Sequence, residues 1–171
     1  MKSHLRHVFS LALLLAPLAV LAQTDSSKDS LFQSRLLNSL HEANLTEMAA
    51  GRMAVTRGAT PAVRQFGAEL VKDHTTADSE LVALAAKLNV VLPAASPPPD
   101  GLDELAQLTG RAFDKAFVKM MLDDHDKALA LIRASLPTVK DGQLSVYLEK
   151  MVRILETHRA TAMRLNQGFQ S

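Results

Sequence analysis

Four ionisable side chains occupy positions where the chain otherwise repeats apolar residues at alternating spacings of three and four. They are Glu47, His74, His125 and His158. Imidazole nitrogens and carboxylate oxygens can hold Zn, Fe, Mn or Cu, in a closed four-coordinate site or with one position open. The same groups could instead form a metal-free hydrogen-bond network, and their spacing does not decide between the two.

Each of the four lies near the middle of an apolar stripe typical of a bundle helix. A carboxylate buried among apolar residues needs a cation or hydrogen-bond donors, because an unpaired buried charge is very costly. At the helical rise, Glu47 and His74 lie about 18 and 22 Å from the turn between their helices, and His125 lies about 21 Å from the opposite end. We therefore expect these three in one layer, with His158 about one to two turns away.

Three further side chains border this expected layer. Asp73 and Asp124 each directly precede a stripe histidine. One position is a rotation of about 100°, so each aspartate could face a neighbouring helix and orient the histidine there. Solvated surface positions are the alternative for both. His41 lies one place off its stripe and is expected at the surface.

The elements that must position these side chains are helices. Ala and Leu recur, only 4% of residues are aromatic, and Trp is absent, which favours an all-α fold. A capping box from Ser30 to Gln33, Thr60-Pro61 and Asp141 are start signals, and Pro137 is a stop signal. The predicted long helices are 30–57, 61–89, 109–136 and 142–167, with a short helical turn at 102–108.

The connections between these helices predict the topology. Short turns join the first to the second helix and the third to the fourth, so each pair is an antiparallel hairpin. About twenty residues, including the Pro-rich stretch 92–101, separate the pairs, where adjacent antiparallel helices need about two to eight. A crossover of that length returns the chain to the far end. The sequence therefore predicts a four-helix bundle of ferritin-like topology.

The N-terminus has the pattern of a secretory signal. Lys2 and Arg6 precede an apolar run that ends at Val20-Leu21-Ala22, which predicts a signal peptide at 1–22. The polar segment 23–29 is expected to be flexible, and the bundle domain to span 30–171. The mature protein is then periplasmic or otherwise secreted, with no transmembrane helix after cleavage. An uncleaved membrane anchor is the alternative.

Composition excludes several function classes. Loss of the two basic residues of the signal leaves 17 basic and 18 acidic residues, without a basic stripe, which argues against nucleic acid as a partner. The absence of cysteine rules out disulfides, thiolate metal sites and cysteine nucleophiles. No phosphate loop, nucleophile elbow or catalytic triad is recognisable.

Several stretches resemble a known family. The segments 69–75 (ELVKDHT), 108–114 (LTGRAFD) and 124–128 (DHDKA), together with His158, are similar to the exported bacterial family catalogued as domain of unknown function 4142. The resemblance implies a ferritin-like four-helix fold in envelope proteins but no established activity. The positions that match its polar pattern are Glu47, Asp73, His74, Asp114, His125 and His158.

The sequence differs from di-iron proteins of the ferritin-like fold, which carry Glu-x-x-His on two helices. Val71, Leu122 and Leu155 stand three places before the stripe histidines. We expect an exported protein that binds one metal ion through the four stripe residues. The alternative is a metal-free structural or interaction module of the cell envelope that serves under stress. No acid–base pair identifies an enzyme, and any activity would be metal-dependent redox chemistry.

The predicted signal can be tested by mass. Protein isolated from the cell envelope should begin at Gln23, because signal peptidase reads the small residues that end at Ala22. Intact-mass spectrometry checks this. A full-length mass in the membrane pellet would show an uncleaved anchor instead.

Overall fold

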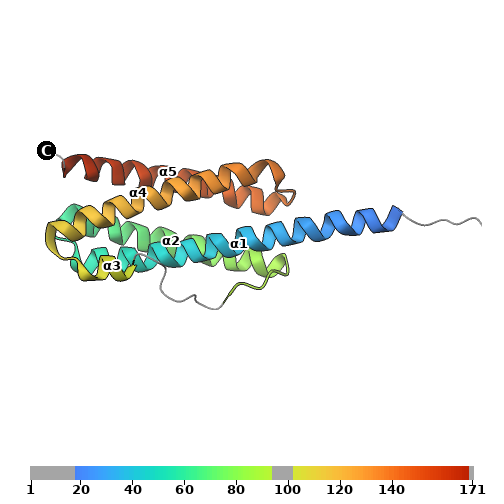
Figure 1. Cartoon of the computed structure of the whole chain (residues 1–171), viewed down its shortest axis with the longest axis horizontal. Coiled ribbons are helices and arrows are strands. Elements are labelled where there is room, and N and C mark those ends of the chain that lie inside the picture. Colours follow the sequence, from blue (N-terminus) through green and yellow to red (C-terminus); the bar gives the residue numbers. More distant parts are fainter. Residues whose placement is uncertain (1–17, 94–101, 170–171) are drawn as a thin grey trace, which may run out of the picture. The chain divides into compact units, whose positions relative to one another are not determined.

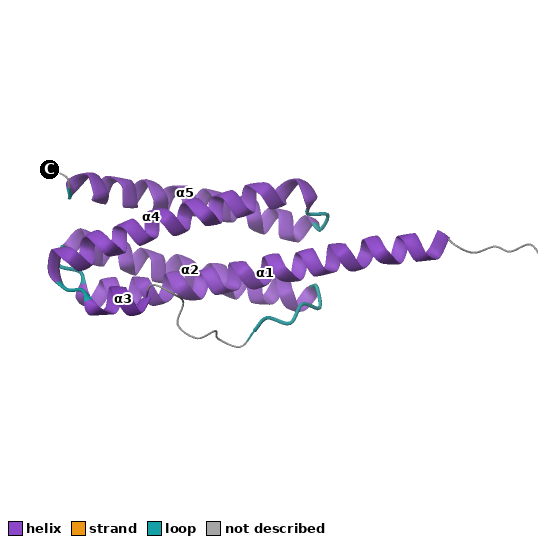
Figure 2. Cartoon of the chain, in the orientation of Figure 1, coloured by secondary structure: helices purple, strands orange, loops and turns teal. Residues whose placement is uncertain are grey.

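The computed structural model describes residues 18–93 and 102–169. The elements are α1 (Leu18–Arg57), α2 (Pro61–Lys87), α3 (Leu102–Gln107), α4 (Gly110–Ser135), the 3₁₀ turn η1 (Leu136–Thr138) and α5 (Gly142–Gly168). All regular structure in these two ranges is helical (Figures 1 and 2). The predicted all-α four-helix fold is confirmed.

Local signals set the boundaries of the helices. The Thr60 side chain accepts a hydrogen bond from the Val63 amide at the start of α2, where Pro61 supplies a favourable φ. Asp141 caps α5 by accepting from the Leu144 amide at 2.8 Å. Asn89 has a φ of 54°, a left-handed conformation that an α-helix cannot continue through.

Helix α1 begins earlier than predicted. It starts at Leu18 instead of Ser30, and neither Gly nor Pro interrupts the chain between Leu18 and Ala50. The segment 23–29, expected to be flexible, is therefore helical. Most of the predicted signal peptide lies outside the described residues. No described helix is long and apolar enough to cross a membrane.

The chain divides into two compact units, one ending at Phe32 and the other beginning at Gln33. Within the second unit, residues 33–57 of α1 form one antiparallel hairpin with α2, and α4 and α5 form the other (Figure 1). Helices α2 and α4 begin at the same end of the bundle, as the ferritin-like crossover requires. Residues 94–101 of that connection lie outside the described ranges.

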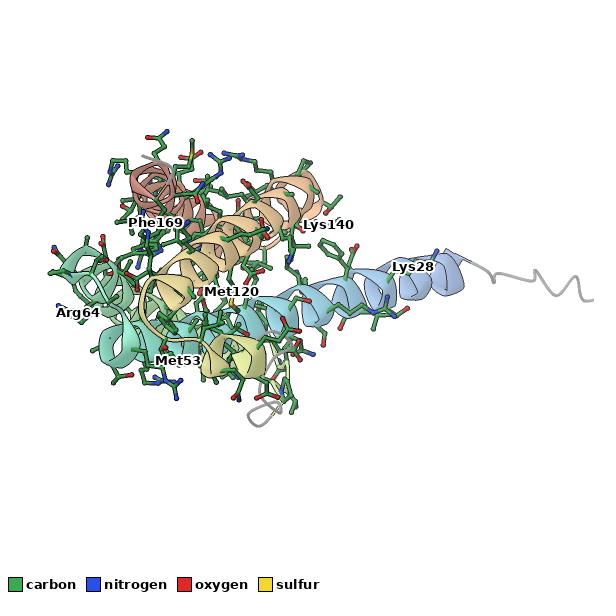
Figure 3. The ribbon with its side chains drawn as sticks, turned by 60° about the vertical axis from the view of Figure 1, so that its left-hand side comes forward. Lys28, Met53, Arg64, Met120, Lys140 and Phe169 are labelled. Atoms are coloured by element: carbon green, nitrogen blue, oxygen red, sulfur yellow. The ribbon has the colours of Figure 1, made fainter. Side chains whose placement is uncertain are left out.

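The core consists of two apolar clusters. The first, here called the Leu cluster, contains Leu37, Leu81, Ile132 and Leu148 and adjoins the α4–α5 connection. The second, the Phe cluster, contains Phe66, Phe113 and Phe117 from α2 and α4. Met53 of α1 and Met120 of α4, labelled in Figure 3, pack against the Phe cluster. Each long helix carries one of the four predicted ligands between its residues of the Leu cluster and those of the Phe cluster. These are Glu47, His74, His125 and His158.

Two glycines let α1 and α2 approach closely. A Cβ on Gly67 would lie 2.6 Å from the Ala54 Cβ and 2.7 Å from the Gly51 carbonyl oxygen. A Cβ on Gly51 would lie 2.7 Å from the Gly67 carbonyl oxygen. The contact fixes the relative height of the two helices about one turn from Glu47 and two turns from His74.

Gly67→Ala should therefore destabilise the protein. The added methyl group must push apart two packed backbones, which costs about 1–3 kcal/mol of unfolding free energy. Gly142→Ala is the matched control, because nothing lies within 4 Å of its added Cβ and the residue begins a helix. Urea denaturation should show a loss for the first variant and no loss for the second. Equal stabilities would contradict the close crossing.

Candidate metal centre

The structure brings three histidines from three helices into contact. His74 of α2, His125 of α4 and His158 of α5 each offer one ring nitrogen, and these atoms lie within 4.8 Å of one another. The ring centroids are 6.0 Å apart for His74 and His125, and 5.4 Å apart for each pair that includes His158. Small side-chain movements would let all three nitrogens lie about 2.0–2.1 Å from one shared metal ion, the usual metal–nitrogen distance.

Hydrogen bonds fix the orientation of each ring. His74 Nδ1 lies 3.0 Å from Asn44 Oδ1, and His125 Nδ1 lies 2.8 Å from the Met121 carbonyl oxygen. His158 Nε2 lies 3.1 Å from Asp73 Oδ2. Since these partners accept, the ring nitrogen that faces them carries the proton in each neutral histidine. The opposite nitrogen then carries a lone pair.

Those opposite nitrogens are the unusual feature of the site. His74 Nε2, His125 Nε2 and His158 Nδ1 are buried and have no hydrogen-bond partner among the described residues. Three buried acceptors without donors would each carry a desolvation penalty of about 1–3 kcal/mol. One shared cation would satisfy all three together.

Burial keeps His74 and His125 neutral. Burial is the main cause that lowers the pKa of His74 to about 3, and the nearby rings of His158 and His125 contribute less. Burial, followed by His158, lowers the pKa of His125 to about 4. Two of the three lone pairs are therefore free of protons at neutral pH, which is the state that binds metal.

Glu47 lies beside the trio, in contact with His125. Its Oε1 is 3.3 Å from His125 Nδ1, the nitrogen opposite the lone pair, and its oxygens do not belong to the three-histidine group. Its Oε2 has no hydrogen-bond partner in the part of the chain described. Burial, and then the charge of Asp124, raise the pKa of Glu47 well above 4.5.

A cavity of about 510 Å³ reaches Glu47 and His74 from the side of α1 and α4. Asp124, Lys127 and Tyr147 line it. Its other walls are largely apolar and include Leu40, Ala43, Ala128, Leu131, Ile132, Met151 and Leu155.

His158 lies closer to the other histidines than its position in the sequence predicts. The prediction ended the third helix before Pro137, whereas η1 continues it to Thr138. From His125 to Ser135 the chain rises about 15 Å, η1 adds about 6 Å, and α5 rises about 24 Å to His158. The 3₁₀ turn thus removes most of the expected offset.

The two aspartates take different positions. Asp73 contacts His158 from the neighbouring helix, the geometry expected of a residue that orients a ligand. Asp124 instead pairs with Lys127 on its own helix at 3.0 Å. Its effect on the site comes through the pKa of Glu47.

Two further residues near the site differ from the sequence predictions: Asn44 was not predicted, and His41 was predicted at the surface. Asn44, which holds His74, was not identified, although it lies one turn before Glu47 on the same face. His41, expected at the surface, is only 8% exposed and lies 2.7 Å from Asp78. The Asn44 amide also reaches Asp78, at 3.4 Å, so His41, Asp78 and Asn44 form one chain of contacts that leads to His74.

Asp114, which the family resemblance singled out, lies away from the histidines. It is fully buried and accepts hydrogen bonds from the amides of Ala59 and Thr60 at 2.8 and 3.0 Å. It therefore ties α4 to the turn between α1 and α2. This role is structural, because both oxygens are occupied by backbone amides.

The chain is similar to known proteins in its fold and in its family. No curated protein sequence matches it. Solved structures of CopM are similar in fold. The form described as Cu(II)-bound has a TM-score of 0.69 at 13% identity, over 80% of this chain and 96% of that one. The Cu(I)-bound form has a TM-score of 0.70 at 14% identity, over 81% and 97%.

An Ag-bound form of CopM, obtained by soaking, gives a TM-score of 0.67 at 14% identity, over 81% of this chain and 96% of that one. At these identities the likeness is one of fold. The family model described as Domain of unknown function (DUF4142) matches residues 18–165, which confirms the resemblance found in the sequence. The chain belongs to this family of helical-bundle proteins.

Proposed function

We propose that this protein is an exported copper-binding protein that holds one Cu(I) ion between His74, His125 and His158. Two observations support this proposal: the three histidines each offer a nitrogen within 4.8 Å of the others, and each has one buried ring nitrogen without a hydrogen-bond partner in the described structure. Three imidazoles are a suitable ligand set for copper. The export signal predicted at 1–22 would deliver the protein to the envelope.

The charge balance of the site favours a monovalent ion. The three ligands are uncharged when they bind, and the site lies between two apolar clusters. Because the cost of burying charge rises steeply with that charge, Cu(I) suits this environment better than Zn(II), Mn(II) or Fe(II). The copper- and silver-bound states of the CopM structures support the same choice.

Glu47 would act on the ion through His125. When a cation binds at His125 Nε2, the proton on Nδ1 becomes a stronger donor toward Glu47 Oε1, 3.3 Å away. The positive charge would also favour loss of the Glu47 proton, so that a carboxylate offsets the charge of the metal. We propose that Glu47 supports the site in this way without coordinating the metal itself.

The rival function is that of a metal-free structural module. It is favoured by the contact between Glu47 and His125, which gives the layer part of its hydrogen bonding without any ion. It leaves the three free nitrogens unexplained. The two functions differ in whether metal changes the stability of the protein.

Cu(I), or Ag(I) as a redox-inert probe, should bind one ion per chain. At a free concentration of about 100 times Kd, binding contributes about 2.7 kcal/mol, which corresponds to a rise in Tm of roughly 5–10 °C for a domain of this size. His74→Ala should abolish that rise. Differential scanning calorimetry with and without metal provides the measurement.

His41→Ala is the matched control, since it removes another buried histidine that lies outside the trio. Because His41 reaches His74 only through Asp78 and Asn44, this variant should keep a metal-induced rise in Tm, in contrast to His74→Ala. If Cu(I), Ag(I), Cu(II) and Zn(II) all leave the wild-type Tm unchanged, the layer is a metal-free network and the rival function holds.

The pH at which metal is released tests the burial of the ligands. Solvated imidazoles exchange metal for protons near their ordinary pKa of about 6.5. Because burial lowers the pKa of His74 to about 3 and that of His125 to about 4, protons compete only at lower pH. Protein passed through gel filtration at pH 5.5 should therefore retain its Cu(I) by elemental analysis. Half-release near pH 6.5 would indicate ligands in contact with water.

A further inference from the structure

His158 belongs to two different groups of potential ligands. Its ring takes part in the buried trio and also in a second group with Glu69 and Asp73, whose ligand atoms again lie within 4.8 Å of one another. Nε2 faces Asp73, while Nδ1 is buried without a partner in the described structure. His158 thus connects the two groups, and its two ring nitrogens differ in their contacts.

An ion must cross protein to reach the trio, because all three free nitrogens are buried. The three rings differ in what holds their other nitrogen. His125 Nδ1 contacts a backbone carbonyl oxygen, and the Glu47 side chain beside it is only 7% exposed. His74 Nδ1 contacts Asn44, which is 3% exposed. Asp73, which holds His158, has 30% of its side chain exposed. Among the three groups that hold these rings, Asp73 alone is a charged ligand that solvent reaches.

The cavity beside Glu47 and His74 is the competing route. Its walls are largely apolar, and its partly exposed carboxylate, Asp124, is already paired with the Lys127 ammonium at 3.0 Å. A cation gains little from such walls in exchange for lost water. Carboxylates near the surface, in contrast, attract cations before they bind and raise the rate of association.

We propose that Glu69, Asp73 and Nε2 of His158 form a capture site through which copper reaches the buried trio. The ion first binds the two carboxylates and the outer nitrogen of His158. It then exchanges to the inner nitrogen of the same ring, where His74 and His125 complete its coordination. Glu69 and Asp73 thus control the rate of loading, and the trio sets the affinity.

The exchange balances without a redox step. When the ion takes Nε2, the proton on that atom leaves to solvent and another is taken up on Nδ1. Transfer of the ion to Nδ1 reverses both changes, so the ring returns to its starting tautomer. Copper keeps its oxidation state throughout, and only its ligands change.

This inference rests on the proposed copper site, and its test separates the two. The rate of Cu(I) transfer from a coloured Cu(I) chelate to the full mature protein is followed by stopped-flow absorbance. Glu69→Gln and Asp73→Asn should each slow loading by about tenfold. Both should still bind one ion per chain, and extraction by excess chelator should slow to the same extent, because entry and exit share one route.

Two comparisons make the result specific. Glu80→Gln removes a carboxylate from the same helix, paired with Lys150 and eleven positions further along, and should load at the wild-type rate. In Asp73→Asn the amide oxygen can still accept from His158 Nε2. If Asp73 only orients the ring, that variant and Glu69→Gln will both load normally, and the proposal is overturned.

The cavity route gives a different outcome. Ala128→Phe places a large side chain in the cavity wall. Slow loading of this variant, with normal loading of Glu69→Gln and Asp73→Asn, would show that copper enters through the cavity and would overturn the capture site. A wild-type protein that takes no copper from the chelate would refute the copper site itself, a result that the loading variants cannot produce.

Discussion

The structure depends on a polar layer that divides an otherwise apolar core. The Leu cluster and the Phe cluster would bury their side chains equally well as one continuous core. Instead, His74, His125, His158 and Glu47 lie between them, nearly inaccessible to solvent. Burial lowers the pKa values of His74 and His125, and their neutral imidazoles lower the cost of this layer, but three ring nitrogens remain without donors in the described structure. A protein retains such a layer at a loss of stability unless something fills it.

The surrounding structure holds the layer together from three directions. The close approach at Gly51 and Gly67 sets the height of α1 against α2. The hydrogen bonds from Asp114 anchor α4 to the turn between those helices. The 3₁₀ turn η1 then determines how far α5 returns along α4. Each of these features acts one or more turns away from the histidines, and together they bring residues from three helices to one level.

The partners of the three rings differ in a way that relates to function. A backbone carbonyl and a buried amide hold His125 and His74, and neither can leave its position without disturbing the core. His158 is held by a half-exposed carboxylate that has a second acid nearby. Two of the rings are therefore held by buried groups and the third by a group that solvent partly reaches. Such asymmetry is what a binding site needs if it is both to hold an ion and to exchange it.

The sequence by itself determined the helices, their pairing and the identity of the polar residues. Periodicity and capping signals are local, so the starts of α2 at Thr60 and of α5 at Asp141 could be predicted from the sequence directly. The length of the Pro-rich connection was enough to predict the crossover. The heights of Glu47, His74 and His125 followed from the constant rise of the α-helix.

Only the tertiary structure decided how these side chains meet. Counting residues cannot show that a 3₁₀ turn extends the chain beyond α4. The prediction therefore placed His158 at the wrong height. Nor can it show ring rotation, which depends on acceptors such as Asn44 and Asp73 supplied by other helices. Glu47 was expected among the ligands, and the structure adds that its Oε1 lies 3.3 Å from His125 Nδ1, the nitrogen that contacts the Met121 carbonyl oxygen. Hydrogen-bond direction is set by contacts between distant segments, which periodicity within one helix does not record.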